Sequence, residues 1–197
     1  MGKLEPVIEE AQNVECQLLF MDAAHFIIQP FICDLWYVTR LFIKASSGRN
    51  RINVLGVVNA ITKEVLTLCN TTYISAETIV VFLKKLKEYY GDLPLKIVLD
   101  NARYQHCQLV EEAANALNIT LLFLPSYSPN LNIIERLWKF TKKTILYAKY
   151  YETPEKFHSA ITGFFQIINQ KYNPDLKKLL TLKFQFFEKE NVIIYPV

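Results

Sequence analysis

Three acidic residues in this chain have the type and the surroundings needed to hold a divalent metal ion. Asp22 follows the apolar run Leu18–Met21, and Asp100 follows a second apolar run. Glu135 comes later, after a gap of 34 residues that spans positions 101 to 134. Carboxylate oxygens are the ligands that Mg²⁺ prefers, and a pair of such ions can catalyse the cutting and joining of phosphodiesters. The sequence therefore predicts that the three carboxylates converge on one metal-dependent site.

Each of these residues also has an ordinary structural explanation. Asp22 is of the type that forms a turn after a strand, and Asp100 could cap a helix near Arg103. Asn132 and Glu135 have the spacing of a capping box, in which the Glu side chain returns to the start of its helix. The combination favours the metal site, because like charges that converge on one point require a compensating cation.

The elements that must position these residues follow from the apolar pattern. Strands are expected at 18–21, 35–43, 53–58, 65–68, 95–99 and 120–124. Helices are expected from Ser75 to Gly91, around 107–117, from about 132 to 149, and from Thr153 to about 173. This order predicts an α/β domain with a mixed sheet, an antiparallel meander from about 17 to 69 followed by parallel strands, flanked by helices. Functional groups gather at the carboxyl ends of neighbouring parallel strands, which is where Asp100 is expected.

Length and composition are those of one folded domain. The 197 residues are 51% hydrophobic, and we expect a peripheral segment at 1–15 and a single domain at 16–197. The net charge of +3 is compatible with nucleic-acid binding without requiring it. Four scattered cysteines, with no Cys-x-x-Cys pair, predict reduced thiols in an intracellular protein. No apolar run approaches the roughly 20 residues of a membrane span, so no membrane partner is expected.

Three segments together resemble the catalytic core of mariner-type DDE transposases, and in particular its bacterial insertion-sequence branch. They are Met21-Asp22-Ala-Ala-His25-Phe26, Leu99-Asp100-Asn-Ala-Arg103, and Leu124-Pro-Ser-Tyr-Ser-Pro-Asn-Leu-Asn-Ile-Ile-Glu135-Arg-Leu-Trp138. The gap of 34 residues before Glu135 matches that branch. The last motif is long and specific, and the resemblance extends from about Leu18 to Tyr172.

The resemblance implies an RNase H-like fold with a mixed five-stranded sheet, and Asp22, Asp100 and Glu135 as catalytic ligands of two Mg²⁺ ions, with Mn²⁺ as a substitute. It implies a transposase that cleaves DNA at the ends of an insertion sequence and transfers the strand to target DNA. The implied partners are both kinds of DNA, and the implied assembly is a homodimer or larger. The implied location is the cytoplasm, at the nucleoid.

Two departures from the family pattern bear on this expectation. Ile133 stands where the family often has Pro, a change that removes only a preorganised backbone at a first helical position. Complete family members also carry helix-turn-helix modules before the core, whereas Asp22 lies near the start of this chain. The alternatives are therefore a separately encoded helix-turn-helix subunit, or an inactive or incomplete remnant that binds DNA or a partner without transposing. An RNase H-like nuclease that acts on RNA–DNA hybrids is a further alternative.

Several basic residues are candidates for DNA contacts. Lys139 and Lys142 share a helical face with Glu135, where they could hold phosphates or simply form a solvated face with one Glu–Lys pair. The other candidates are Lys44, Arg49 and Arg51, around a Ser-Ser-Gly turn that could equally be merely solvated, and Arg103. His25 could orient a water or a phosphate or pack in the sheet. Trp138 is expected to pack in the core or against a partner helix, and not to stack on a base.

Overall fold

The computed structural model describes residues 4–28, 50–100, 102, 105–125 and 131–182. The strands are β1 (Gln17–Ile27), β2 (Arg51–Asn59), β3 (Val65–Asn70), β4 (Leu95–Leu99) and β5 (Ile119–Phe123). The helices are α1 (Glu5–Gln12), α2 (Ala76–Tyr90), α3 (Gln108–Ala116), α4 (Ile134–Ile145), α5 (Pro154–Lys171) and α6 (Asn173–Leu179). None of these helices combines the length and the apolar character needed to cross a membrane.

The five strands form one mixed sheet in the order β3-β2-β1-β4-β5. β1, β2 and β3 pair antiparallel as a meander, whereas β4 pairs parallel with both β1 and β5. The helices α2 and α3 supply the connections between β3, β4 and β5. The predicted mixed five-stranded sheet, an antiparallel meander followed by parallel strands, is confirmed.

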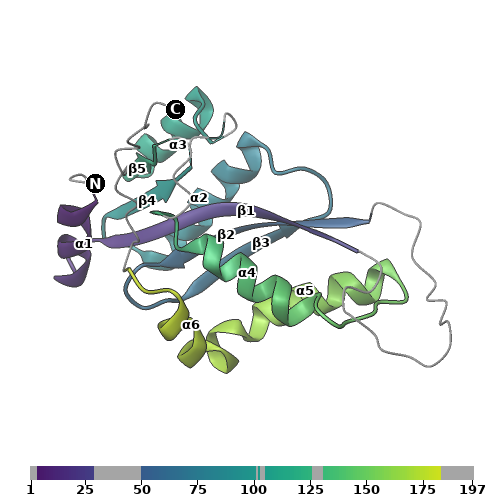
Figure 1. Cartoon of the computed structure of the whole chain (residues 1–197). Helices are drawn as coiled ribbons and strands as arrows, with labels where there is room; N and C mark the ends of the chain where they lie inside the picture. Colours follow the sequence, from purple (N-terminus) through teal and green to yellow (C-terminus); the bar gives the residue numbers. More distant parts are fainter. Residues whose placement is uncertain (1–3, 29–49, 101, 103–104, 126–130, 183–197) are drawn as a thin grey trace, which may run out of the picture.

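Alternation along β1 divides the core into two layers. Leu18 and Phe20 are buried in one apolar cluster with residues of α4, α5 and α6. Leu19 and Met21 are buried in the other cluster, with residues of α2 and α3. Because successive side chains of a strand point to opposite faces, the sheet lies between two helical layers. Figure 1 shows the result, with α4 and α5 on one side of the sheet and α2 and α3 on the other.

Most helix boundaries follow the local signals of the sequence. Ser75 caps α2 in a capping box with Thr78, and Gly91 ends it with a φ of +69°. Thr153 caps α5 by accepting a hydrogen bond from the backbone of Lys156. The segment expected to be peripheral contains α1, whose Val7 and Ala11 are buried in the cluster with α4. The domain boundary at residue 16 stays a prediction.

Other boundaries differ from those expected. β1 continues to Ile27 because β2 pairs with it residue by residue, from Leu19–Asn59 to Ile27–Arg51. α4 ends at Ile145 rather than at Lys149, and a short helix, α6, follows α5. The strand expected at 35–43 lies outside the described residues.

We predict that Asn169 closes an edge of the sheet. β3 is an edge strand, and the Asn169 side chain accepts from the Val65 N–H and donates to the Val65 carbonyl oxygen, both at 2.8 Å. Asn169→Ala leaves both backbone groups without this partner, so urea unfolding should show a loss of about 1–3 kcal/mol in the free energy of unfolding. Gln170→Ala, at an exposed position one residue on, is the control and should change it by less than about 0.5 kcal/mol. Equal losses in the two variants would contradict the prediction.

Candidate active site

Asp22 lies in the middle of β1, and not at a strand end as expected. It follows Phe20 by two residues, so it points to the face that α4 covers. The side chain is only 7% exposed, and its Oδ2 accepts a hydrogen bond of 2.9 Å from the Trp138 indole. Asp22 is therefore not a turn residue, because the strand pairing continues past it to Ile27.

Asp100 comes directly after β4, as expected. The parallel pairing of β1 and β4 matches Phe20 with Val98, and two further steps in the same register place Asp100 beside Asp22. Val98 belongs to the cluster beneath α4, so the same alternation directs Asp100 to the face of Asp22. Asp100 Oδ1 accepts from the backbone of Ala102, at 3.3 Å, and the next helix begins only at Gln108. Asp100 is therefore not a cap of that helix.

Glu135 lies in the first turn of α4, on the face of the sheet that also carries Asp22. The predicted capping box is not formed as expected, because the Asn132 side chain accepts from the Ile134 backbone at 3.3 Å. The N-cap position is Ile133, which makes no side-chain cap. A structural cap therefore does not account for Glu135.

The charges of Asp100 and Glu135 both act on the buried Asp22 carboxylate. The pKa of Asp22 is raised to about 7, mainly by burial, and the charges of Asp100 and Glu135 contribute to this rise. Hydrogen bonds from the Ala23 backbone and from Trp138 lower it without cancelling the effect. Among the residues that the structure describes, no group of three His, Cys, Asp or Glu side chains is tight enough to hold a metal ion. The carboxylate oxygens fit a divalent cation as donors, and the side chains must draw closer to enclose one.

Trp138 contributes more than the core packing expected of it. It is 3% exposed and donates directly to Asp22, which makes it a neighbour of the candidate site. Its position three residues after Glu135, on the same helical face, was the available signal. His25, the candidate for orienting a water or a phosphate, lies on the opposite face because of the alternation of β1, and its Nδ1 is 2.6 Å from the Asn53 amide oxygen.

The basic candidates are dispersed. Lys139 and Lys142 are exposed on α4, close in sequence to Glu135. Arg51 lies at the start of β2, where its guanidinium sits 4.8 Å from the ring centre of Tyr73. Ile52 belongs to the cluster beneath α4, so Arg51 points to the other face of the sheet, away from Asp22. Lys44, Arg49 and Arg103 lie outside the described residues.

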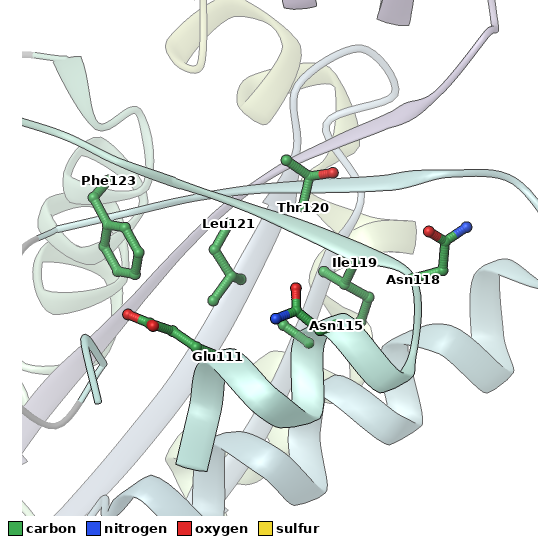
Figure 2. A pocket seen from close by; sticks show the side chains of 8 residues that line it. Glu111, Asn115, Asn118, Ile119, Thr120, Leu121 and Phe123 are labelled. Carbon is green, nitrogen blue, oxygen red and sulfur yellow. The ribbon is translucent and has the colours of Figure 1, made fainter. Parts of the chain in front are cut away.

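A pocket also lies at the outer edge of the sheet, between α3 and β5. Figure 2 shows Glu111 of α3 and Thr120 and Phe123 of β5 among the side chains that line it. It contains none of the predicted site residues. The face of the sheet that carries Asp22, Asp100 and Glu135, called the carboxylate face below, is therefore separate from this pocket.

The fold and the carboxylate face together define an RNase H-like α/β domain with an acidic site. Residues 17–158 match the family model of the DDE superfamily endonucleases, and the chain belongs to that family. The resemblance to a DDE catalytic core is thereby confirmed. No curated protein sequence matches the chain.

Solved structures share the fold at low sequence identity. The Mos1 strand transfer complex matches with a TM-score of 0.63 and 14% identity, over 89% of this chain and 56% of that one. The catalytic domain of Mos1 mariner transposase matches with a TM-score of 0.59 and 12% identity, over 90% of this chain and 84% of that one. A simian T-cell lymphotropic virus intasome matches with a TM-score of 0.54 and 15% identity, over 78% of this chain and 48% of that one. The chain thus spans about half the length of the longer structures that it matches.

We predict a pH dependence of stability that depends on Asp22. The folded-state pKa of about 7 exceeds the value of about 4 of an unfolded Asp, so between these pH values only the folded protein holds the proton. The contribution of Asp22 to the free energy of unfolding is full below pH 4 and decreases as the pH rises towards 7, by up to about 4 kcal/mol.

Urea unfolding in EDTA at pH 5 and pH 7.5 checks this dependence. Asp22→Asn should flatten it, whereas the exposed Asp92→Asn should leave it as in the unmodified chain. Parallel changes in all three proteins would show that Asp22 titrates normally.

Proposed function

We propose that this chain is the catalytic domain of a transposase that cleaves DNA at the ends of an insertion sequence and joins the freed strand to target DNA. The observation that carries the proposal is the placement of Asp22, Asp100 and Glu135 on one face of an RNase H-like sheet. Family membership supports phosphodiester chemistry, and the similarity to Mos1 structures supports the transposase class. In the first step a water would attack the phosphorus and break its bond to the 3′-oxygen, which leaves a 5′-phosphate and a 3′-hydroxyl. In the second step this 3′-hydroxyl would attack a phosphodiester of the target and displace the 3′-oxygen of the target strand.

Asp22, Asp100 and Glu135 would hold the divalent ions. Solved Mos1 paired-end complexes contain Mn in one case and Mg in another, which supports Mg²⁺ with Mn²⁺ as a substitute. When bound, two such ions activate the attacking oxygen and stabilise the leaving one. Our candidate for the ligand shared by the two ions is Asp100. It would lie beside Asp22 if the β1–β4 register continued, and it does not cap α3.

DNA would approach over α4. Lys139 and Lys142 expose their ammonium groups on the helix that carries Glu135, where phosphates of a bound duplex would come near the carboxylates. Lys44, Arg49, Arg51 and Arg103 are further candidates. A homodimer or larger assembly would bring two element ends together, with end recognition by helix-turn-helix modules. We place this activity at the nucleoid.

We predict that Asp100→Asn removes metal-dependent nicking of duplex DNA. Loss of an outer-shell partner weakens a metal site by about 10–100-fold, so loss of a ligand should lower the nicking rate by more than about 100-fold. A plasmid-relaxation assay in Mg²⁺ or Mn²⁺ measures the rate, with the exposed Asp92→Asn as the control that stays active. Unchanged nicking by Asp100→Asn would contradict the mechanism, and faster cleavage of RNA–DNA hybrids than of duplex DNA would favour the RNase H alternative.

We also predict that Lys139 and Lys142 contact phosphates. Each phosphate contact adds about 0.9 to the slope of log binding constant against log salt concentration, so the double alanine variant should lower the slope by about 2. Fluorescence anisotropy with a labelled duplex at several salt concentrations measures it. Lys85→Ala, exposed on α2 in the opposite helical layer, is the matched control and should leave the slope unchanged. A normal slope for the double variant would place the DNA elsewhere.

A further inference from the structure

One hydrogen bond joins β1, the strand that carries Asp22, to α4, the helix that carries Glu135. Trp138 of α4 donates its indole N–H to Asp22 Oδ2 across 2.9 Å, and both side chains are buried. The two residues are 116 positions apart in the sequence, so the bond depends on the tertiary fold. A buried indole N–H requires an acceptor, and here the acceptor is a candidate metal ligand.

A glycine makes room for this indole. Gly56 of β2 is the residue paired with Asp22 across the antiparallel ladder. A Cβ atom at position 56 would lie 2.7 Å from Trp138 Cη2, closer than Cβ atoms approach other heavy atoms, and 3.3 Å from Cζ2, which is a tight contact. Any larger residue would therefore push the indole away from the sheet, and with it the N–H that reaches Asp22.

Two aromatic rings hold the indole on its other sides. Phe26 and Phe165 both meet Trp138 edge to face, with ring centres 6.2 Å and 6.3 Å away. These rings pack against the indole but offer Asp22 no hydrogen-bond donor. Packing and hydrogen bonding at Trp138 can therefore be separated by substitution.

We propose that Trp138 is a positioning residue, seated in the gap that Gly56 leaves, whose N–H orients the Asp22 carboxylate for a divalent cation. This inference rests on the proposed function. The bond commits one carboxylate oxygen and so restricts rotation of the Asp22 carboxylate. Because Glu135 lies one helical turn before Trp138, the same bond sets how close the Glu135 end of α4 comes to β1. Metal-binding carboxylates are commonly held by such outer-shell partners.

Calorimetric titration of the full chain with Mn²⁺ tests the proposal directly. Trp138→Phe keeps an aromatic ring and loses the donor, so Mn²⁺ affinity should decrease by about 10–100-fold. Phe165→Leu replaces one ring beside the indole with another apolar side chain and keeps the donor, so it should bind Mn²⁺ nearly as the unmodified chain does. Normal affinity in Trp138→Phe, or an equal loss in Phe165→Leu, would overturn the positioning role.

A double-mutant cycle tests the part of Gly56. Gly56→Ala alone should weaken Mn²⁺ binding by about tenfold or more, through displacement of the indole. In the Trp138→Phe background the same change should add less than about twofold, because Phe lacks the two atoms that the new methyl group would meet. Additive losses would show that Gly56 acts independently of Trp138, contrary to the proposal.

Further measurements distinguish failure of the positioning role from failure of the proposed function. If Asp22→Asn and Asp100→Asn abolish Mn²⁺ binding while Trp138→Phe does not, the proposed function survives and the positioning role fails. If the unmodified chain binds no Mn²⁺, both fail. Should Trp138→Phe not fold, the indole N–H resonance of the unmodified chain decides, with Trp36→Phe used to assign it. Its chemical shift should change as Mg²⁺ is added, with the same apparent dissociation constant as metal binding. A chemical shift that does not change would overturn the proposal.

Discussion

A carboxylate buried between a sheet and a helix, with two more acidic groups beside it, is the constraint on which this structure depends. Asp22 is 7% exposed, and both Asp100 and Glu135 raise its pKa. Burying such a group is unfavourable unless something compensates it, and the described partners are two N–H donors from Ala23 and Trp138. A divalent cation would supply the missing positive charge, which is why the arrangement indicates a metal-dependent enzyme.

The rest of the fold brings these groups to one face. The parallel register of β1 and β4 places the first two acidic residues on neighbouring strands, and alternation turns both towards α4. α4 then contributes Glu135 in its first turn and Trp138 one turn later. Buried residues at Leu137, Thr141 and Ile145 hold that helix against the sheet and leave Lys139 and Lys142 in solvent. One helix thus carries a carboxylate, its structural link to the sheet, and the candidate phosphate contacts.

Local signals in the sequence predicted much of this arrangement, and tertiary pairing supplied the rest. The caps at Ser75 and Thr153, the stop at Gly91 and the apolar stripe of α4 act within one or two turns, so the sequence shows them directly. The length of β1 depends on its pairing with β2, which continues past Asp22, a residue of the type that forms turns. The close approach of Gly56 to Trp138 depends on a strand register and a helix position together, so spacing alone did not predict it. The spacing of Trp138 from Glu135 indicated a shared helical face but not the hydrogen bond to Asp22.

The most direct measurement is a crystal structure of the chain soaked in Mn²⁺, with anomalous diffraction used to locate the ions. We predict manganese between Asp22 and Asp100, with Glu135 drawn in as a further ligand and the Trp138 indole still hydrogen-bonded to Asp22. Manganese bound elsewhere, or three carboxylates that remain apart with no ion among them, would contradict it.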